Sequence, residues 1–325
     1  MGLVEGKYVV GVDLGGTWVR AALSDIKGNM ILKMREQVDR SSADMISKQI
    51  INLIRSLCNR KGIEIKNVEG IGIASAGPLS LKEGALVKPT NLPFKYVPLT
   101  KPVSEELKVP VYLLNDCTAA VLGEKVFGAG KNVDNLVYVT ISTGIGGGAI
   151  VDGHLLIGKD GNAHEIGHFT IDLEGRLVCG CGKKGHWEAY CSGRNIPNYV
   201  KMRCKEIDES IVKESPLYKK LKENLSSKDL YDNAKMGDKL SQQLVEEIGK
   251  LNAIGFANVI NAYDPELITV GGSVTLNNKK LVLTPIRRHV KEYSINRIPK
   301  IVATQLGEDI GLYGSIAGVL ESDQT

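Results

Sequence analysis

The sequence has no hydrophobic run that approaches the roughly 20 apolar residues of a membrane-spanning helix, and it has no dense run of basic residues. Its 41 Lys and Arg residues stand against 37 Asp and Glu residues, so the net charge is only +4. A nucleic-acid-binding domain is expected to carry a clustered basic patch. The segment Met1–Tyr8 contains Glu5 and Lys7 and lacks the apolar core of a signal peptide. We therefore expect a cytoplasmic protein that binds neither membranes nor nucleic acid.

Cysteine is also scarce, and the six cysteines do not form the dense pattern of a disulfide-linked domain. Three of them crowd into one short segment, at Cys179, Cys181 and Cys191. In a reducing compartment a local cluster of this kind is more often a metal site than a set of disulfides. The segment is therefore a candidate metal site.

The overall composition is that of an ordinary globular protein, with 43% hydrophobic and 24% charged residues. A chain of 325 residues suits two domains or one large one. Strand patterns alternate with helical patterns, which indicates an α/β fold. We expect a smaller N-terminal α/β domain over residues 1–115, completed by a C-terminal helix at 311–325, and a larger α/β domain over 116–310. The predicted boundary near Asp116 places a cleft between the two domains.

Local patterns predict the main elements of this fold. Two β-branched apolar runs around a Gly-Gly-Thr turn predict a hairpin of Tyr8–Leu14 and Val19–Ser24. Apolar residues at helical spacing predict a helix over residues 43–60. The other predicted strands are Val68–Ala74, Val109–Leu114, Leu136–Ser142, Ala149–Val151 and Leu267–Val270. The other predicted helices are Thr118–Phe127 with Asp116 as its N-cap, most of residues 193–260, and Gly311–Leu320.

Each half of the chain begins with a strand that leads into a glycine turn. Asp13 precedes Gly15-Gly16-Thr17 in the first half, and Thr143 precedes the glycine-rich segment Gly144–Gly148 in the second. Glycine lets backbone N–H groups approach phosphate oxygens without interference from a Cβ atom. The two turns are therefore candidates for holding a triphosphate, with Asp13 as a candidate ligand of magnesium through water.

Other nucleotide motifs fit less well. Gly123 and Gly128 have the spacing of a P-loop, but Ala129 stands where that motif requires lysine. The glycines at 144, 146 and 147 introduce a strand, whereas a dinucleotide-binding loop introduces a helix. Simple hairpin turns are the structural alternative for each cluster. A third glycine pair, Gly271-Gly272, follows another predicted strand and favours a phosphate-binding function for the set.

These motifs together resemble the ROK family of sugar kinases. The matching segments are Asp13–Thr17 with Arg20, Asn115-Asp116 with Ala119-Ala120 and Gly123-Glu124, Ser142–Gly148, Glu165–His168, Cys179–Glu188, Gly271-Gly272 and Leu312–Ala317. They follow one another in order over nearly the whole chain, and several of them are specific.

The resemblance implies an actin-like ATPase fold, related to ribonuclease H, with two domains around a cleft. It also implies ATP-dependent phosphorylation of the 6-hydroxyl of a hexose such as glucose, or of an N-acetylhexosamine such as N-acetylmannosamine or N-acetylglucosamine. ATP with Mg²⁺ would be the phosphoryl donor. The family often forms dimers, which makes a homodimer a candidate assembly.

The family also contains sugar-binding transcriptional repressors with an additional N-terminal helix-turn-helix domain. In this sequence the Asp13 motif begins within about ten residues of the first residue, so the kinase branch is favoured over a regulator that binds sugar without turnover. A nucleotide-dependent structural protein of the actin class would leave Glu165, Glu188 and the metal-site residues unexplained.

Asp116 is the residue that the resemblance implies as the general base for the accepting hydroxyl. A helix N-cap is the structural alternative, and one residue can serve both purposes. The implied sugar-binding residues are Gly77, Asn91, Asn115, Asp116, Glu165, His168 and Glu188. The implied ATP-binding residues are Asp13, Gly15, Gly16, Thr17, Arg20, Thr143, Gly144, Gly271 and Gly272.

A structural zinc site is implied at His168, Cys179, Cys181 and His186. The family usually has cysteine where this chain has His186, and zinc accepts either residue in a closed tetrahedral site. Cys191 is the alternative fourth ligand if His186 points away. In the family, the residue equivalent to His168 binds zinc with one ring nitrogen and faces the sugar with the other. A second departure is His164, where the family often has glycine.

Overall fold

The computed structural model describes residues 7–89 and 91–322. In that part of the chain two compact units can be distinguished. Unit 1 comprises the residues up to Asp134, the segment Gly148–Ala163 and the residues from Gln305 on, and unit 2 comprises Asn135–Gly147 and His164–Thr304. The division at Asp116 that the sequence favours stays a prediction about domain boundaries.

The first five-stranded sheet has the order β3-β2-β1-β4-β8. Its strands are β1 (Tyr8–Leu14), β2 (Trp18–Asp25), β3 (Met30–Gln37), β4 (Val68–Ser75) and β8 (Val111–Asn115). β1 pairs antiparallel with β2, which confirms the predicted hairpin, and parallel with β4. β4 is also parallel to β8, so Leu14, Ser75 and Asn115 are aligned across three neighbouring strands. The carboxyl ends of β1, β4 and β8 therefore meet at one edge of this sheet.

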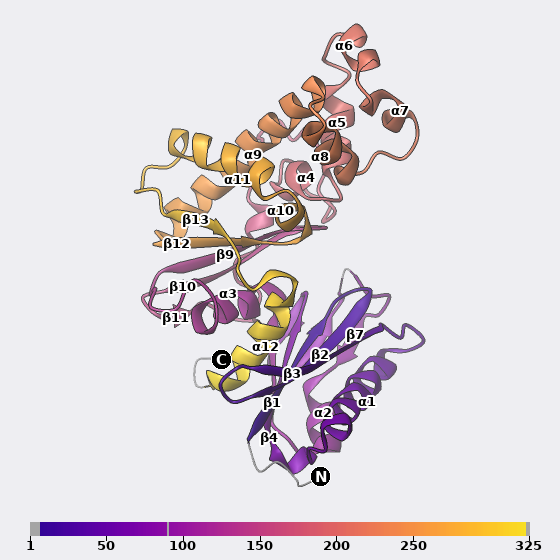
Figure 1. Ribbon diagram of the computed structural model, residues 1–325, viewed down its shortest axis with the longest axis vertical. Helices are drawn as coiled ribbons and strands as arrows, with labels where there is room; N and C mark the ends of the chain where they lie inside the picture. The colour runs from indigo at the N-terminus through magenta and orange to yellow at the C-terminus, as the bar shows by residue number, and fades with distance from the viewer. Residues whose placement is uncertain (1–6, 90, 323–325) are drawn as a thin grey trace. The chain divides into compact units, whose positions relative to one another are not determined.

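Side chains alternate between the two faces of this sheet, as a pleated strand requires. Val10 and Val12 of β1 pack into the core that includes α1 (Ala43–Lys61), whereas Val9 packs with α12 (Ile310–Leu320). Figure 1 shows α1 and α2 (Thr100–Leu107) on one side of the sheet and α12 on the other. α12 also packs along α3 (Asp116–Val126). The core of unit 1 is thus two helical layers around a sheet.

Short elements complete unit 1. They are η1 (Ile65–Asn67), a three-stranded sheet of β5 (Leu79–Ser80), β6 (Ala85–Val87) and β7 (Tyr96–Pro98), and η4 (Gly307–Asp309). The first residue of α3 is Asp116, and the side chain of Asn115 accepts hydrogen bonds from the N–H groups of Cys117 and Thr118. The predicted N-cap at Asp116 is therefore wrong by one residue, because the Asn115 amide reaches the orphan donors of the first turn.

The second five-stranded sheet has the order β11-β10-β9-β12-β13. Its strands are β9 (Leu136–Ile141), β10 (Ile145–Val151), β11 (His154–Leu155), β12 (Leu267–Gly271) and β13 (Lys300–Ala303). β12 is parallel to β9 and to β13, and β10 is antiparallel to β11. Counted in chain order, both sheets have the arrangement third, second, first, fourth, fifth strand. The weak repetition of glycine turns in the sequence thus corresponds to a repeated sheet topology.

The predicted glycine loop Gly144–Gly148 is shorter than expected, because β10 begins at Ile145. The turn itself is Ser142–Gly144, and the N–H of Ser142 donates to the carbonyl of Gly144. Gly147 lies inside β10, where a Cβ would come within 3.0 Å of the Ile166 side chain. The later glycines thus allow close packing of a strand and do not extend the turn.

Most of unit 2 between residues 188 and 263 is helical, which confirms the predicted helical region. The helices are α4 (Glu188–Cys191), α5 (Ile196–Arg203), α6 (Glu209–Glu214), α7 (Leu217–Lys222), α8 (Ser227–Lys235) and α9 (Lys239–Tyr263). The remaining ones are α10 (Ser273–Asn277), α11 (Lys279–His289), η2 (Ile166–His168) and η3 (Val290–Glu292). Over the residues that the structure describes, none of the helices combines the length and apolarity of a bilayer span.

Candidate active site

The carboxyl edge of the first sheet carries the predicted ATP-binding turn of unit 1. Asp13 lies at the end of β1, and its carboxylate accepts a hydrogen bond from Nε of Arg20 at 3.0 Å. The same guanidinium donates to the carbonyl of Glu308 at 2.8 Å. Arg20 therefore orients Asp13, and its guanidinium is already bound by the Asp13 carboxylate and the Glu308 carbonyl. The turn Gly15–Thr17 is closed by a bond from the N–H of Gly15 to the carbonyl of Trp18 at 2.9 Å.

Asn91 lies against this turn. A Cβ on Gly16 would come within 3.0 Å of the Asn91 Cβ, and Arg40 donates to the carbonyls of both residues. The amide oxygen of Asn91 is buried and has no hydrogen-bond partner among the described residues. A buried acceptor without a donor is costly, so this atom suits a hydroxyl group of a bound molecule.

Asn115 and Asp116 join β8 to α3 at the same edge of the sheet. The Asn115 Oδ1 atom accepts from the N–H of Cys117 at 2.9 Å, and one Asp116 carboxylate oxygen accepts from the same N–H at 2.8 Å. Both side chains are half-buried. These bonds fix the Asp116 carboxylate relative to the strand. A general base needs such a fixed position, because it must receive a proton from a positioned hydroxyl.

Gly77 follows β4 and lies beside a residue that the sequence did not single out. The amide of Asn162 accepts from the N–H of Leu79 at 2.9 Å and donates to its carbonyl at 3.1 Å. A Cβ on Gly77 would come within 3.1 Å of that same amide oxygen. Asn162 is thus a positioning residue for the Gly77 turn, and no local sequence pattern indicates this pairing because the residues are distant in the chain.

In unit 2, the turn Ser142–Gly144 meets two other turns. The N–H groups of Gly193 and Arg194 donate to the carbonyls of Ser142 and Thr143 at 2.7 and 3.2 Å. The hydroxyls of Ser142 and Ser273 are 3.1 Å apart. Gly272, at φ +85°, would bring a Cβ within 2.6 Å of the Thr140 hydroxyl. The Ser142–Gly144 turn and the segment after Gly271-Gly272 are therefore in contact, and their role in ATP binding stays a prediction.

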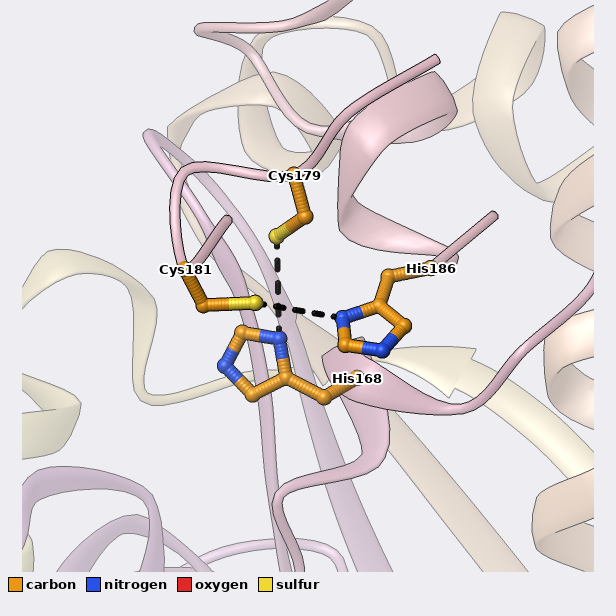
Figure 2. A group of neighbouring side chains, drawn as sticks. All are labelled: His168, Cys179, Cys181 and His186. Atoms are coloured by element: carbon orange, nitrogen blue, oxygen red, sulfur yellow. Dashed lines mark hydrogen bonds between the residues drawn. The ribbon is translucent and has the colours of Figure 1, made fainter. Parts of the chain in front are cut away.

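The candidate metal residues also come together, as Figure 2 shows. Their ligand atoms all lie within 4.8 Å of one another: those of His168, Cys179, Cys181 and His186. The Cys179 sulfur is 3.7 Å from Nδ1 of His168, and the Cys181 sulfur is 3.3 Å from Nδ1 of His186. Sulfur and nitrogen ligands of a tetrahedral zinc ion are separated by about 3.5 Å, given Zn–S and Zn–N bonds of about 2.3 and 2.0 Å. The donor set and its spacing therefore fit zinc.

Cys191 does not belong to this cluster. It is fully buried, and its thiol contacts the carbonyl of Ile248 at 3.8 Å. His186 is held toward the cluster because the next residue, Trp187, is also fully buried. The indole N–H of Trp187 donates to the Asn252 amide at 2.8 Å. Trp187 thus anchors both His186 and Glu188 to α9.

His168 and two carboxylates form the predicted sugar-binding group. Nδ1 of His168 faces the cysteines, and its Nε2 lies 3.7 Å from the Glu165 carboxylate. Glu188 accepts from the N–H of Ile145 at 2.9 Å and from the Cys179 thiol at 3.5 Å. Desolvation raises the pKa of Glu165, the neighbouring His168 opposes this rise, and the Glu188 carboxylate adds to it.

Burial raises the pKa of the Cys179 thiol to about 12. This thiol is therefore protonated at neutral pH without a metal, and zinc would have to displace the proton. Burial and the neighbouring His168 lower the pKa of His186, which favours the neutral imidazole that metals bind.

His164 begins the segment that leads to Glu165. Its backbone is in the left-handed region at φ +62°, which favours glycine. The imidazole is buried against Tyr263, and its two nitrogens have no partner among the described residues. Burial lowers the pKa of this ring to about 4, so it is neutral at physiological pH.

Comparison with known proteins agrees with this geometry. A glucokinase from Pyrobaculum calidifontis is 34% identical over 319 residues, which cover 98% of this chain and 97% of that protein. The ROK hexokinase from Thermus thermophilus has a TM-score of 0.80 at 28% identity, with 98% of this chain and 100% of that chain covered. A ROK family glucokinase from Streptomyces griseus, in complex with glucose and AMPPNP, has a TM-score of 0.76 at 30% identity, with 95% and 98% covered.

A regulator is also among the relatives. The xylose repressor of Bacillus subtilis is 28% identical over 317 residues, which cover 97% of this chain but 77% of the repressor. The fold shared with the kinases is the actin-like ATPase fold that the sequence predicted. The family model described as ROK family matches residues 9–321. The chain therefore belongs to the ROK family.

Proposed function

We propose that this chain transfers the γ-phosphoryl group of ATP to the 6-hydroxyl of glucose, with Asp116 as the general base. The coarser class, an ATP-dependent hexokinase, follows from its family and from relatives that are named glucokinases. The choice of glucose over N-acetylmannosamine or N-acetylglucosamine rests on those names. The observation that carries the proposal is the alignment of Leu14, Ser75 and Asn115, which brings the Gly15–Thr17 turn and Asp116 to one sheet edge.

Asp116 is suited to the base because phosphoryl transfer needs a positioned acceptor more than a strong one. Its carboxylate is fixed by the N–H of Cys117. From that position it would accept the proton of the attacking hydroxyl. The Asn115 amide oxygen is engaged with the first turn of α3, so its NH₂ group would donate to a neighbouring sugar hydroxyl.

The remaining sugar hydroxyls would be bound by Glu165, His168 and Glu188, with Asn91 and Gly77 as further contacts. Carboxylates are strong acceptors for hydroxyl groups, and each charge-assisted hydrogen bond is worth about 1.5–3 kcal/mol. His168 would donate or accept at Nε2, since its Nδ1 faces Cys179. If a sugar hydroxyl replaces the Ile145 N–H as the donor to Glu188, it would have to form a hydrogen bond of equal strength.

ATP would be held by the backbone donors of both glycine turns. Mg²⁺ neutralises phosphate charge in this class of reaction, and the oriented carboxylate of Asp13 would hold it through water. The zinc residues would have a structural role, since four protein ligands leave no open coordination position. Their contribution to sugar binding is the orientation of His168.

A panel of hexoses and N-acetylhexosamines, assayed with ATP and Mg²⁺ for release of ADP, tests the proposal. We expect turnover with glucose and formation of glucose 6-phosphate. The alternative function is a sugar-binding regulator, because the xylose repressor is a relative. Calorimetry on the same sugars distinguishes the two functions, since it measures binding without turnover. Glucose binding without ADP release would replace the kinase proposal with the regulatory one. A cytoplasmic location and a homodimer stay predictions from the sequence.

A further inference from the structure

Arg194 lies at the meeting point of the three turns in unit 2. Its backbone N–H donates to the carbonyl of Thr143 at 3.2 Å, in the proposed ATP-binding turn. The preceding residue allows this approach because it is glycine: a Cβ on Gly193 would come within 2.8 Å of the Ser142 carbonyl oxygen. Arg194 therefore starts from a backbone position that is fixed against the turn.

The turn offers backbone donors, and the one carboxylate that contacts its end, that of Glu188, is bound to neighbouring groups. Among the described residues, the N–H groups of Thr143 and Gly144 have no hydrogen-bond acceptor. The N–H of Ile145 is satisfied by Glu188, whose other oxygen is within 3.5 Å of the Cys179 sulfur. The carboxylate nearest the turn is thus already engaged. What remains open is a pair of backbone donors, which is a local arrangement that favours an anion.

The Arg194 side chain is exposed and, over the residues that the structure describes, has neither an ion-pair partner nor a hydrogen-bond acceptor. Arg20, the arginine that the sequence assigns to ATP, differs in this respect. Its guanidinium is bound to Asp13 and to the Glu308 carbonyl. In unit 2, Arg194 is therefore an exposed cation beside the glycine turn, without a protein partner among the described residues.

We propose that Arg194 is a phosphate-binding residue for the nucleotide, acting with the N–H groups of Thr143 and Gly144. This proposal rests on the proposed kinase function. A guanidinium can contact phosphate oxygens through two parallel N–H bonds, which gives direction as well as charge. Arg194 would thus add a positive charge to the backbone donors of this turn.

Arg194→Gln tests this assignment in the full-length protein, with calorimetry of AMPPNP in the presence of Mg²⁺. We expect the Kd for AMPPNP to rise about tenfold or more, with the Kd for glucose unchanged. The Kd for adenosine, which has no phosphate, should also be unchanged. Raising the salt concentration should weaken AMPPNP binding less in the variant than in the wild type, because one phosphate contact is lost.

Arg297→Gln is the matched control, because Arg297 is also exposed, belongs to unit 2 and has no ion-pair partner among the described residues. Arg194→Lys should retain part of the affinity, because it keeps the charge and loses the paired geometry. An AMPPNP affinity for Arg194→Gln equal to that of Arg297→Gln overturns the assignment, and so does an equal loss of adenosine or glucose affinity. If the wild type binds no AMPPNP at all, the kinase proposal itself fails.

Discussion

The carboxylate of Glu188 accepts a hydrogen bond from the backbone N–H of Ile145 at 2.9 Å. Through this bond a residue of the proposed sugar-binding group supports the start of β10, directly after the proposed ATP-binding turn. Gly144 makes the contact possible, since a Cβ at this position would come within 2.5 Å of the same carboxylate oxygen.

Gly144→Ala should therefore displace the Glu188 carboxylate. We expect the Kd for glucose, measured by calorimetry, to rise roughly ten- to hundredfold, the equivalent of one lost charge-assisted hydrogen bond. Gly180→Ala is the matched control, because a Cβ at Gly180 meets nothing within 4 Å. Equal glucose affinity in the two variants would contradict a role for this contact.

Asp116→Asn should remove the base and keep the shape of the site. We expect kcat to fall by about 10²–10⁴-fold, while glucose binding followed by calorimetry is retained. Asp44→Asn provides the control, since Asp44 is an exposed acid in the first turn of α1, as Asp116 is in the first turn of α3. Turnover of Asp116→Asn at the rate of the control would exclude Asp116 as the base.

Metal analysis of the purified protein should find about one zinc per chain. His186→Ala should lose that zinc to a chelator far faster than the wild type, because three ligands remain. Cys191→Ala should hold zinc as the wild type does, since Cys191 is buried against Ile248 and lies outside the cluster. Retention of zinc in His186→Ala together with its loss in Cys191→Ala would reverse the choice of the fourth ligand.

His289 should make stability depend on pH. Hydrogen bonds that the His289 ring donates to the carboxylates of Glu246 and Glu292 raise the pKa of His289 in the folded protein. A group whose pKa is raised by folding stabilises most below its unfolded pKa, near 6.5 for histidine, and this contribution is lost as the pH rises through the folded value. His289→Gln should thus lower the urea midpoint more at pH 5.5 than at pH 8.5.

The exposed His154 gives the control for this pH effect. The effect of His289→Gln on the urea midpoint is compared at each pH with that of His154→Gln, which replaces a histidine elsewhere on the surface. A His289→Gln difference that is independent of pH, or larger at pH 8.5, would show that the two glutamates do not stabilise the charged imidazole.

At His164 the backbone conformation can be separated from the side chain by two substitutions. His164→Gly and His164→Ala both remove the buried imidazole and its contact with Tyr263. Only alanine retains the cost of a left-handed conformation at φ +62°, which is about 1–2 kcal/mol. Chemical denaturation should find the glycine variant more stable by about 1 kcal/mol, and equal stabilities would indicate that the backbone relaxes.

Much of the fold could be predicted because its signals are local. The predicted hairpin around Gly15–Thr17 is present, and the helix predicted over residues 43–60 is α1. The errors are also local, and tertiary packing explains them. Asn115 caps α3 in place of Asp116, and Gly147 is buried inside β10 because Ile166 packs on it.

By itself the sequence determined the repeated strand-and-glycine-turn halves, the metal-type donor set and the match to the ROK family, because these depend on residue type and on short spacings. Tertiary structure alone decided which distant groups meet. Strand register aligned Leu14 with Ser75 and Asn115, and the burial of Trp187 turned His186 rather than Cys191 toward the cluster. Arg194 gained its candidate role in the same way, since only the folded chain brings it to Thr143. Spacing along the chain does not determine such contacts, because they depend on how separate elements pack.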